Sequence, residues 1–339
     1  MADFHTLRVA AVDRLTEDSV AVTFDVPEQL RDAYAFAPGQ HLTLRRWFGQ
    51  EEVRRTYSVC APVGGPLRVG VRNSGLMSSW VCDELRAGDE LDVLTPLGSF
   101  GPRGAVQGKR LGLIAAGSGI TPLLSVAATA LADGAEVLLL FGNRTSRDVM
   151  LVDEVADLKD VHPEAFQVVH VLSREQLGSD LVSGRLEGAR LKALVDAFGR
   201  DVGAWYVCGP FGLVEGAKEL LAAAGATSVH VELFHPEGTV LRPVVQPASG
   251  TELTALLAGR TSTTHLEPGE TVLDGVLRVR ADAPYACRGG VCGTCRARLV
   301  EGEVQMDVNY ALEAEEVEAG IVLTCQSRPT TESVRVEYL

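Results

Sequence analysis

The residues most able to do chemistry are four cysteines near the end of the sequence. Cys287, Cys292 and Cys295 lie within nine positions, with four and then two residues between them. Cys325 follows after 29 more residues. This spacing is the plant-type pattern in which four thiolates bind a [2Fe-2S] cluster. A four-cysteine zinc site is the alternative, although zinc sites usually combine two short Cys hooks and only one is present here.

The residues between these cysteines favour a small cluster wrapped by backbone. Gly289, Gly290 and Gly293 permit tight turns and a close approach of the chain to the sulfurs. Backbone N–H groups brought close in this way stabilise a negatively charged cluster and tune its reduction potential. The segment therefore predicts a carrier of single electrons.

Arg55, Tyr57 and Ser58 form a second group, on a run typical of a β-strand. Alternate residues of a strand share a face, so Arg55 and Tyr57 should lie together. An arginine suits a pyrophosphate, an aromatic ring suits stacking on a flavin, and a hydroxyl can bond the flavin near N5. A surface arginine beside a half-buried tyrosine is the alternative explanation.

Two further segments are suited to binding phosphates and nucleotides. Gly75–Ser79 opens a helix, whose free N–H groups attract phosphate, although a plainly capped helix has the same pattern. Gly117–Pro122 follows an apolar strand and opens another helix, without completing the G-x-G-x-x-G fingerprint. Cys208–Pro210 ends a strand at the same expected sheet edge, where α/β domains bind ligands. Two glycine turns at one edge favour a nucleotide site.

The elements that must position these groups change type along the chain. The first hundred residues have short alternating runs separated by Pro and Gly, which predicts a small antiparallel barrel interrupted by one helix over 77–85. From Arg110 onward, apolar strands alternate with helices, which predicts right-handed βαβ units and a parallel sheet. A stretch rich in Pro and Gly, 236–249, has the composition of a linker.

Bulk composition excludes some functions. The chain has 31 basic and 45 acidic residues and a net charge of −14, which argues against nucleic acid as a partner. It contains no apolar run of about 18 residues, so we expect no membrane span. Its first residues lack the basic and apolar regions of a signal peptide, and we therefore expect a cytoplasmic protein.

Taken together, these segments resemble the ferredoxin–NADP reductase superfamily with a C-terminal plant-type [2Fe-2S] ferredoxin domain. Within it, the likeness is greatest to the reductase subunits of ring-1,2-phenylacetyl-CoA epoxidase. The segments that carry it are Phe4–Leu7, Phe36–Leu42, Phe141–Ser146, Ser179–Leu181 and Tyr285–Cys292. The resemblance implies an FAD-binding antiparallel β-barrel over 1–104, an NAD(P)H-binding α/β domain over 105–235, the linker, and an α+β ferredoxin domain of β-grasp type over 250–339.

The resemblance also implies roles for particular residues. Those expected around the flavin are Arg55, Tyr57, Ser58, Val71, Gly75, Met77, Ser78, Ser79 and, covering the ring, Phe234. Those expected around the nicotinamide are Gly117, Gly119, Thr121, Cys208, Gly209 and Pro210. Of these, Ser58, Thr121 and Cys208 are the expected catalytic residues, and Arg144, Ser173 and Arg174 are expected to bind the 2′-phosphate of NADPH. NADH in place of NADPH, and FMN in place of FAD, remain alternatives.

The implied function is an NADPH-dependent oxidoreductase of a multicomponent monooxygenase. A hydride from NADPH reduces the flavin, which passes electrons singly to the [2Fe-2S] cluster and on to a diiron oxygenase complex, the phenylacetyl-CoA 1,2-epoxidase of phenylacetate degradation. The cofactors perform this chemistry while the protein fixes distance and orientation. A reductase for a ring-hydroxylating or alkane oxygenase is one alternative, and a redox-sensing iron–sulfur flavoprotein is another.

Overall fold

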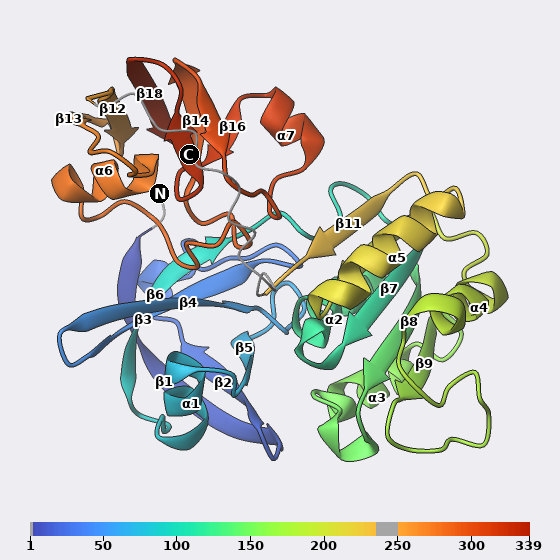
Figure 1. Cartoon of the computed structure of the whole chain (residues 1–339). Helices are drawn as coiled ribbons and strands as arrows, with labels where there is room; N and C mark the ends of the chain where they lie inside the picture. Colours follow the sequence, from blue (N-terminus) through green and yellow to red (C-terminus); the bar gives the residue numbers. More distant parts are fainter. Residues whose placement is uncertain (1–2, 235–249) are drawn as a thin grey trace. The chain divides into compact units, whose positions relative to one another are not determined.

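The computed structural model describes residues 3–234 and 250–339 (Figure 1). Its internal contacts divide the chain into two compact units, Phe4–Glu232 and the C-terminal part from Leu233 onward. The predicted linker, 236–249, lies outside the described residues. In the part of the chain that is described, no helix is both long enough and apolar enough to cross a bilayer.

The first half of the larger unit is a six-stranded antiparallel sheet with the order β4-β3-β6-β1-β2-β5. Its strands are β1 (Phe4–Thr16), β2 (Ser19–Asp25), β3 (His41–Phe48), β4 (Glu51–Ser58), β5 (Leu67–Arg72) and β6 (Glu90–Leu97). A bridge between Val59 and Val69 joins the chain just beyond β4 to β5, the two ends of the sheet, and so closes the barrel. The predicted antiparallel barrel is confirmed.

Apolar side chains from alternate strand positions fill the barrel, as the period of two in the sequence requires. Leu7 and Val9 of β1 and Leu42 and Leu44 of β3 are fully buried there. Helix α1 (Leu76–Asp83) adds Met77, Trp80 and Val81 to the same core. Helix α1, whose first turn is the predicted phosphate site, is therefore fixed by packing against the barrel.

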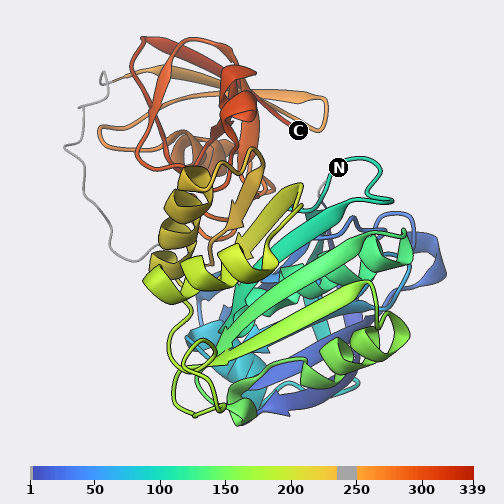
Figure 2. The same cartoon turned by 90° about the vertical axis from the view of Figure 1, so that its right-hand side faces the viewer.

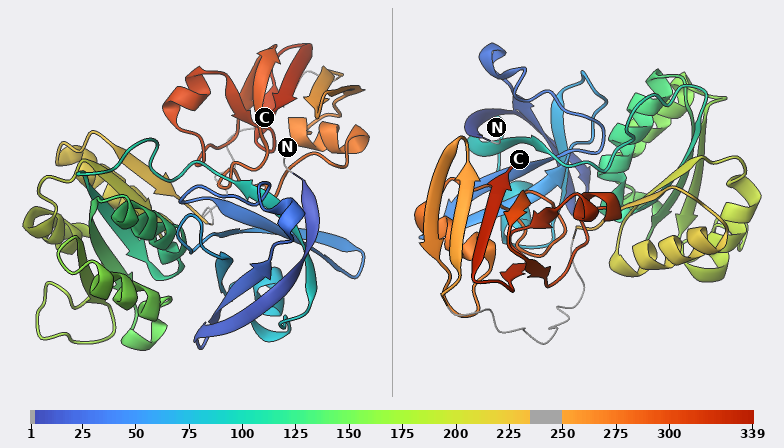
Figure 3. Two further views of the ribbon diagram at one scale, coloured as in Figure 1. Left: turned by 180° about the vertical axis from the view of Figure 1, so that it is seen from behind. Right: turned by 90° about the horizontal axis from the view of Figure 1, so that it is seen from above.

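The second half of the larger unit is a five-stranded parallel sheet with the order β11-β10-β7-β8-β9 (Figure 2). Its strands are β7 (Arg110–Ala116), β8 (Glu136–Asn143), β9 (Phe166–Leu172), β10 (Ala204–Cys208) and β11 (Val229–Glu232). The helices between them are α2 (Ile120–Ala132), α3 (Val152–Val161), α4 (Gly188–Phe198) and α5 (Phe211–Ala223). The earlier helices, coloured green, and the later ones, coloured yellow, cover opposite faces of the sheet (Figure 3).

The strand order places the predicted nucleotide loops side by side. β7 and β10 are neighbours, but the chain leaves β7 toward β8 and leaves β10 toward β11, in opposite directions. Such a reversal opens a crevice beyond the carboxyl ends of the strands, where open α/β sheets bind ligands. Gly117–Gly119, a 3-10 turn, and Cys208–Pro210 stand at this reversal.

The C-terminal unit contains a five-stranded mixed sheet with the order β13-β12-β18-β14-β16. Its strands are β12 (Glu252–Leu257), β13 (Arg260–His265), β14 (Arg296–Glu301), β16 (Ile321–Leu323) and β18 (Ser333–Tyr338). The smaller elements are β15 (Val304–Met306), β17 (Ser327–Pro329), α6 (Val272–Val279) and α7 (Ala314–Glu318). Helix α6 packs Val272 and Val276 onto the sheet residues Leu253 and Val336, the arrangement of a β-grasp fold.

Candidate redox site

The two glycine turns at the strand reversal meet through their backbones. A Cβ atom added to Gly119 would lie 2.1 Å from the carbonyl oxygen of Cys208 and 2.8 Å from the amide nitrogen of Gly209. No side chain fits at this position, so glycine is required for the approach. The structure therefore brings together Gly117, Gly119, Cys208 and Gly209, as the sequence predicted.

Thr121 connects this crevice to the barrel. A Cβ added to Gly70 of β5 would lie 2.4 Å from Cγ2 of Thr121, so the threonine methyl packs on the barrel strand next to Val71. Its hydroxyl donates to the carbonyl oxygen of Ser118 at 3.0 Å. Thr121 thus lies where the Gly117–Gly119 turn meets the barrel, and its one proton is used within that turn.

Ser58, at the end of β4, reaches across to the last strand of the parallel sheet. Its Oγ donates to Glu232 Oε1 at 3.0 Å. Glu232 is the direct partner of Cys208 in the pairing of β10 with β11, so three polar side chains from distant parts of the chain gather at one place. Glu232 is a residue of this group that the sequence did not single out.

Protein surroundings set the protonation of this group. Part of Glu232 reaches the surface, but protein atoms enclose its carboxyl; this burial raises its pKa to about 7, while the hydrogen bond from Ser58 has the opposite effect. Burial, and then the neighbouring Glu232, raise the pKa of the Cys208 thiol well above its usual value. Cys208 is therefore a neutral thiol at neutral pH, and Glu232 is the group that changes charge there.

The residues predicted for the flavin line the β4 edge of the barrel and the start of α1. Arg55 is exposed and Tyr57 is half-buried on the same face of β4. Ser78 Oγ accepts from the backbone N–H groups of Ser74 and Gly75, each at 2.9 Å. The serine hydroxyl thus caps the helix, and the first backbone N–H groups of α1 are the donors suited to a phosphate.

Arg46 of β3 is a cation beside α1 that the sequence did not single out. Its guanidinium lies 3.8 Å from the ring centroid of Trp80, and its Nε is buried without a hydrogen-bond partner among the described residues. A buried donor without a partner favours an anionic or polar ligand nearby. Together with Arg55, this environment suits the phosphates of a flavin dinucleotide.

The predicted 2′-phosphate residues lie on two adjoining loops at the carboxyl edge of β8 and β9. The N–H groups of Ser173 and Arg174 donate to the carbonyl oxygens of Asn143 and Arg144, at 2.9 and 2.8 Å. Both arginines, Arg144 and Arg174, are exposed beside one another at this edge. Glu175 holds its loop by accepting from the N–H and hydroxyl groups of Ser146.

Asn143 is a second residue that the sequence did not single out. It is 8% exposed, and neither polar atom of its side chain has a hydrogen-bond partner among the residues described. It ends β8 at the crevice edge, between the predicted nicotinamide and 2′-phosphate groups. Such a side chain is suited to bind the polar middle of a dinucleotide.

The four predicted cluster ligands form two pairs of thiols. Cys287 contacts Cys292, and Cys295 contacts Cys325. Among the described residues, no three His, Cys, Asp or Glu side chains group around a single ion position. Two thiols for each of two irons is the donor set of a [2Fe-2S] cluster.

Backbone donors surround these sulfurs, as the glycine pattern predicted. The N–H of Gly289 donates to Cys287 Sγ at 3.3 Å. The hydrogen bond from Cys292, together with the N–H groups of Gly289, Val291 and Cys292, lowers the pKa of Cys287 to about 6 against the effect of burial. These donors stabilise negative charge on sulfur, so the site fits an anionic cluster.

The turn itself differs from the expectation at one position. Gly290 and Gly293 have positive φ values of 75° and 65°, but Gly289 does not. Arg288 takes the third left-handed position, with φ 52°. A non-glycine residue in this region is strained unless its surroundings hold it.

Three domain families match the chain in the order that the fold shows. The family model of the oxidoreductase FAD-binding domain matches residues 6–101, and that of the oxidoreductase NAD-binding domain matches 113–219. The 2Fe-2S iron-sulfur cluster binding domain matches 256–330. The chain is therefore an oxidoreductase with domains for FAD, a nicotinamide nucleotide and a [2Fe-2S] cluster.

Similar proteins match over nearly their whole length. The chain is 41% identical to a subunit of the 1,2-phenylacetyl-CoA epoxidase of Escherichia coli (strain K12), covering 100% of this chain and 98% of that protein. It is 35% identical to the ferredoxin reductase component of 3-ketosteroid-9-alpha-monooxygenase of Mycobacterium tuberculosis, covering 98% and 95%. The structure of phthalate dioxygenase reductase has the same fold, with a TM-score of 0.62, 22% identity and coverage of 99% and 98%.

The chain belongs to the family of oxygenase reductase components that includes the Escherichia coli subunit of 1,2-phenylacetyl-CoA epoxidase.

Proposed function

We propose that the chain carries electrons from NADPH, through FAD and a [2Fe-2S] cluster, to the diiron oxygenase of a phenylacetyl-CoA epoxidase. The observation that carries the proposal is a single chain that holds both a nucleotide crevice ending at Ser58 and Glu232 and a site of two thiol pairs. The 41% identity to the epoxidase protein, over the whole chain, supports the choice of oxygenase.

The proposed domains are 1–104, 105–235 and 250–339, joined by 236–249, and the proposed location is the cytoplasm.

When bound, the flavin takes up a hydride as two electrons and the cluster carries them one at a time. The protein's own groups bind and orient these cofactors. Arg55, Arg46 and the first N–H groups of α1 would hold the flavin phosphates, with Tyr57, Val71, Met77, Ser78 and Ser79 around the flavin. Gly117, Gly119, Cys208, Gly209 and Pro210 would hold the nicotinamide close to Ser58. Phe234 belongs to the C-terminal unit, and its role as a cover for the flavin stays a prediction.

Ser58 and Glu232 control a proton at the crevice. While the Glu232 carboxyl is ionised, it accepts the only proton of the Ser58 hydroxyl. Once protonated, below the pKa of about 7, the carboxyl donates to Ser58 Oγ and leaves the serine proton for another acceptor. At lower pH the Ser58 hydroxyl is therefore free to donate its proton to another acceptor.

Glu232→Gln is expected to remove a pH dependence from the reduction of the flavin by NADPH. In the wild type we expect the rate to rise about fivefold as the pH falls through about 7, since one hydrogen bond contributes roughly 1 kcal/mol. The glutamine amide donates to Ser58 at every pH, so the variant should stay at the fast level. Stopped-flow absorbance measures both profiles, and a variant that keeps the wild-type profile would refute the assignment.

Arg174→Ala is expected to reduce the preference for NADPH. Loss of one charge-assisted bond to a 2′-phosphate should lower kcat/KM for NADPH roughly 10- to 100-fold and leave that for NADH nearly unchanged. The control is Arg200→Ala, which removes an exposed arginine ahead of β10, at the amino edge of the sheet. An equal loss of kcat/KM with both nucleotides, or an unchanged kcat/KM with NADPH, would mean that Arg174 does not bind the 2′-phosphate.

The proposed acceptor is tested by turnover with purified oxygenase components. With the oxygenase subunits of a phenylacetyl-CoA epoxidase, NADPH oxidation should depend on phenylacetyl-CoA and yield its epoxide. A chain that instead supports only 3-ketosteroid-9-alpha-monooxygenase, the system of the 35% identical relative, would reassign the partner within the same family. Flavin released by denaturation distinguishes FAD from FMN in the same preparation.

A further inference from the structure

Gln326, the residue after the fourth cluster cysteine, is held inside the C-terminal unit by several contacts. It is 8% exposed. Its backbone N–H donates to the carbonyl oxygen of Leu323, and its own carbonyl oxygen accepts from the N–H of Asp307, both at 2.8 Å. A Cβ added to Gly290 would lie 3.3 Å from Gln326 Cγ, so the cluster-binding turn packs directly on this side chain.

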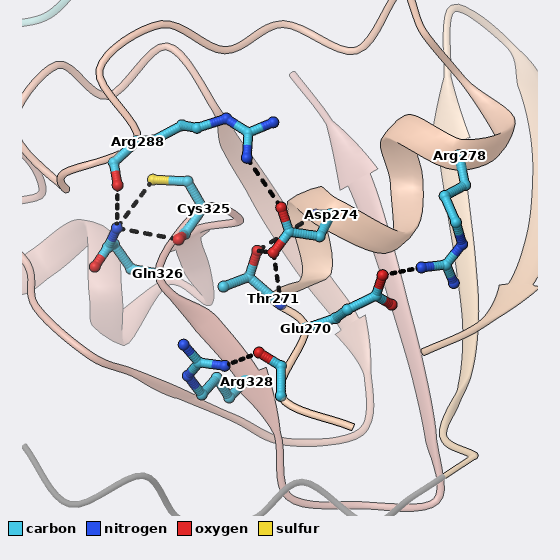
Figure 4. A network of polar contacts seen from close by, with 9 residues as sticks. Glu270, Thr271, Asp274, Arg278, Arg288, Cys325, Gln326 and Arg328 are labelled. Carbon is cyan, nitrogen blue, oxygen red and sulfur yellow. Dashed lines mark hydrogen bonds and ion pairs between the residues drawn. The ribbon is translucent and has the colours of Figure 1, made fainter. Parts of the chain in front are cut away.

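The amide nitrogen of Gln326 serves acceptors on both cluster-binding segments (Figure 4). Nε2 donates to the carbonyl oxygen of Arg288 at 2.8 Å and to that of Cys325 at 3.0 Å. It also lies 3.4 Å from Cys325 Sγ, within hydrogen-bond distance of sulfur. A side-chain amide has two protons for these three acceptors, so at least one proton is shared.

One of these acceptors belongs to the strained residue of the turn. Arg288 has a positive φ of 52°, and its guanidinium is fixed by Asp274 at 3.0 Å and by the ring of Tyr285, whose centroid lies 4.8 Å from Arg288 Cζ. Asp274 is itself fixed by the capping box that it forms with Thr271 at the start of α6. Arg288 is thus held through its side chain by α6 and through its carbonyl by Gln326.

We propose that Gln326 is a positioning residue that sets the reduction potential of the cluster. It acts by donating an N–H to the sulfur of the fourth ligand and by tying the Arg288 turn to the segment of Cys325. The proposal rests on the proposed function, because it requires the [2Fe-2S] cluster at these four thiols.

The direction of the effect follows from charge. The cluster gains one negative charge on reduction, and a donor to a ligand sulfur stabilises the reduced form more than the oxidised form. Gln326 therefore raises the potential, and its removal lowers it. A role in packing alone would leave the potential unchanged.

Gln326→Met tests the proposal in the full-length, cofactor-loaded protein, because methionine fills a similar volume and has no donor. We expect the one-electron equilibrium to shift about tenfold toward the oxidised cluster, which corresponds to about 59 mV. The readout is a redox titration of the cluster followed by EPR. The control is Gln305→Met on β15, where the side chain is exposed, and its potential should match the wild type.

A measurement on the wild type covers the case in which the methionine variant binds no cluster. Protein labelled with ¹⁵N at its glutamine side-chain amides should show one weak nitrogen hyperfine coupling to the reduced cluster in pulsed EPR. Gln305→Met should retain the coupling. Absence of the coupling in the wild type, or an unchanged potential in a cluster-loaded Gln326→Met protein, would overturn the proposal.

These outcomes differ from a failure of the proposed function. If the wild type contained no [2Fe-2S] cluster, the function itself would be wrong. If the wild type contained the cluster and passed electrons from NADPH normally, but gave no glutamine coupling, only the role of Gln326 would be wrong.

Discussion

Cys325→Ser is expected to abolish electron delivery to one-electron acceptors while sparing the flavin half of the molecule. Cys325 is 7% exposed and forms one of the two thiol pairs with Cys295, so its loss leaves one iron with a single thiolate. Loss of residues that only support a metal ligand already costs 10- to 100-fold. We therefore expect cytochrome c reduction driven by NADPH to fall by more than about 100-fold.

Two measurements make this result specific to the cluster. Ferricyanide reduction by NADPH, which the flavin performs directly, should remain near the wild-type rate. Cys60→Ser is the matched control, because Cys60 is also a buried thiol but belongs to the barrel, where its Sγ donates to the carbonyl oxygen of Arg68. A Cys325→Ser protein that kept the EPR signal of the cluster and normal cytochrome c reduction would remove Cys325 from the ligand set.

Gly119→Ala is expected to disable the nucleotide crevice. The added methyl would lie 2.1 Å from the Cys208 carbonyl oxygen and 2.5 Å from the Cys208 carbonyl carbon, so the two turns must separate. A displacement of about 1 Å in a positioned site costs on the order of 100-fold in rate. Steady-state kinetics should therefore show kcat/KM for NADPH reduced by about that factor, with flavin and iron content unchanged.

Gly216→Ala provides the control for this substitution. Gly216 is exposed on α5, and a Cβ there meets no atom within 4 Å. Alanine should leave kcat/KM unchanged and stabilise the helix by about 0.5–1 kcal/mol, which thermal unfolding would register. If both alanine variants had normal kinetics, the close contact between Gly119 and Cys208 would have no part in binding the nucleotide.

The sequence predicted the bounds of strands best where the apolar residues follow a simple pattern. The continuous apolar run Ala204–Cys208 predicts a strand, and β10 has the same bounds. The runs His41–Leu44 and Arg55–Val59 predict two short strands, but the hairpin of β3 and β4 is longer: β3 continues to Phe48 and β4 begins at Glu51. Charged residues occupy its outer half, where Arg45 pairs with Asp92 and the alternation of apolar residues disappears.

The site was predictable where one short segment carries the chemistry. The spacing of the four cysteines indicated their common role, and the structure places their thiols in two pairs. The bond between Ser58 and Glu232 joins residues 174 positions apart, and no local pattern reveals it. Glu232 could have been found from its position in the final strand, which ends beside Cys208.

The glycine positions in the sequence predicted the backbone of the cluster-binding turn only in part. Gly289, Gly290 and Gly293 were expected to permit the tight turns, but Gly289 has no positive φ. Arg288, held by bonds from Asp274 and Gln326, takes a left-handed position instead. These bonds depend on side chains 14 and 38 residues away in the sequence. Local propensity could not predict them.

The central claim is that one chain passes electrons from NADPH through a flavin to a [2Fe-2S] cluster. An anaerobic titration with NADPH, followed by visible absorbance and EPR, tests it most directly. The predicted result is loss of flavin absorbance accompanied by a rhombic [2Fe-2S] signal of about one spin per chain. A reconstituted protein whose flavin is reduced by NADPH while no cluster signal develops would contradict the claim.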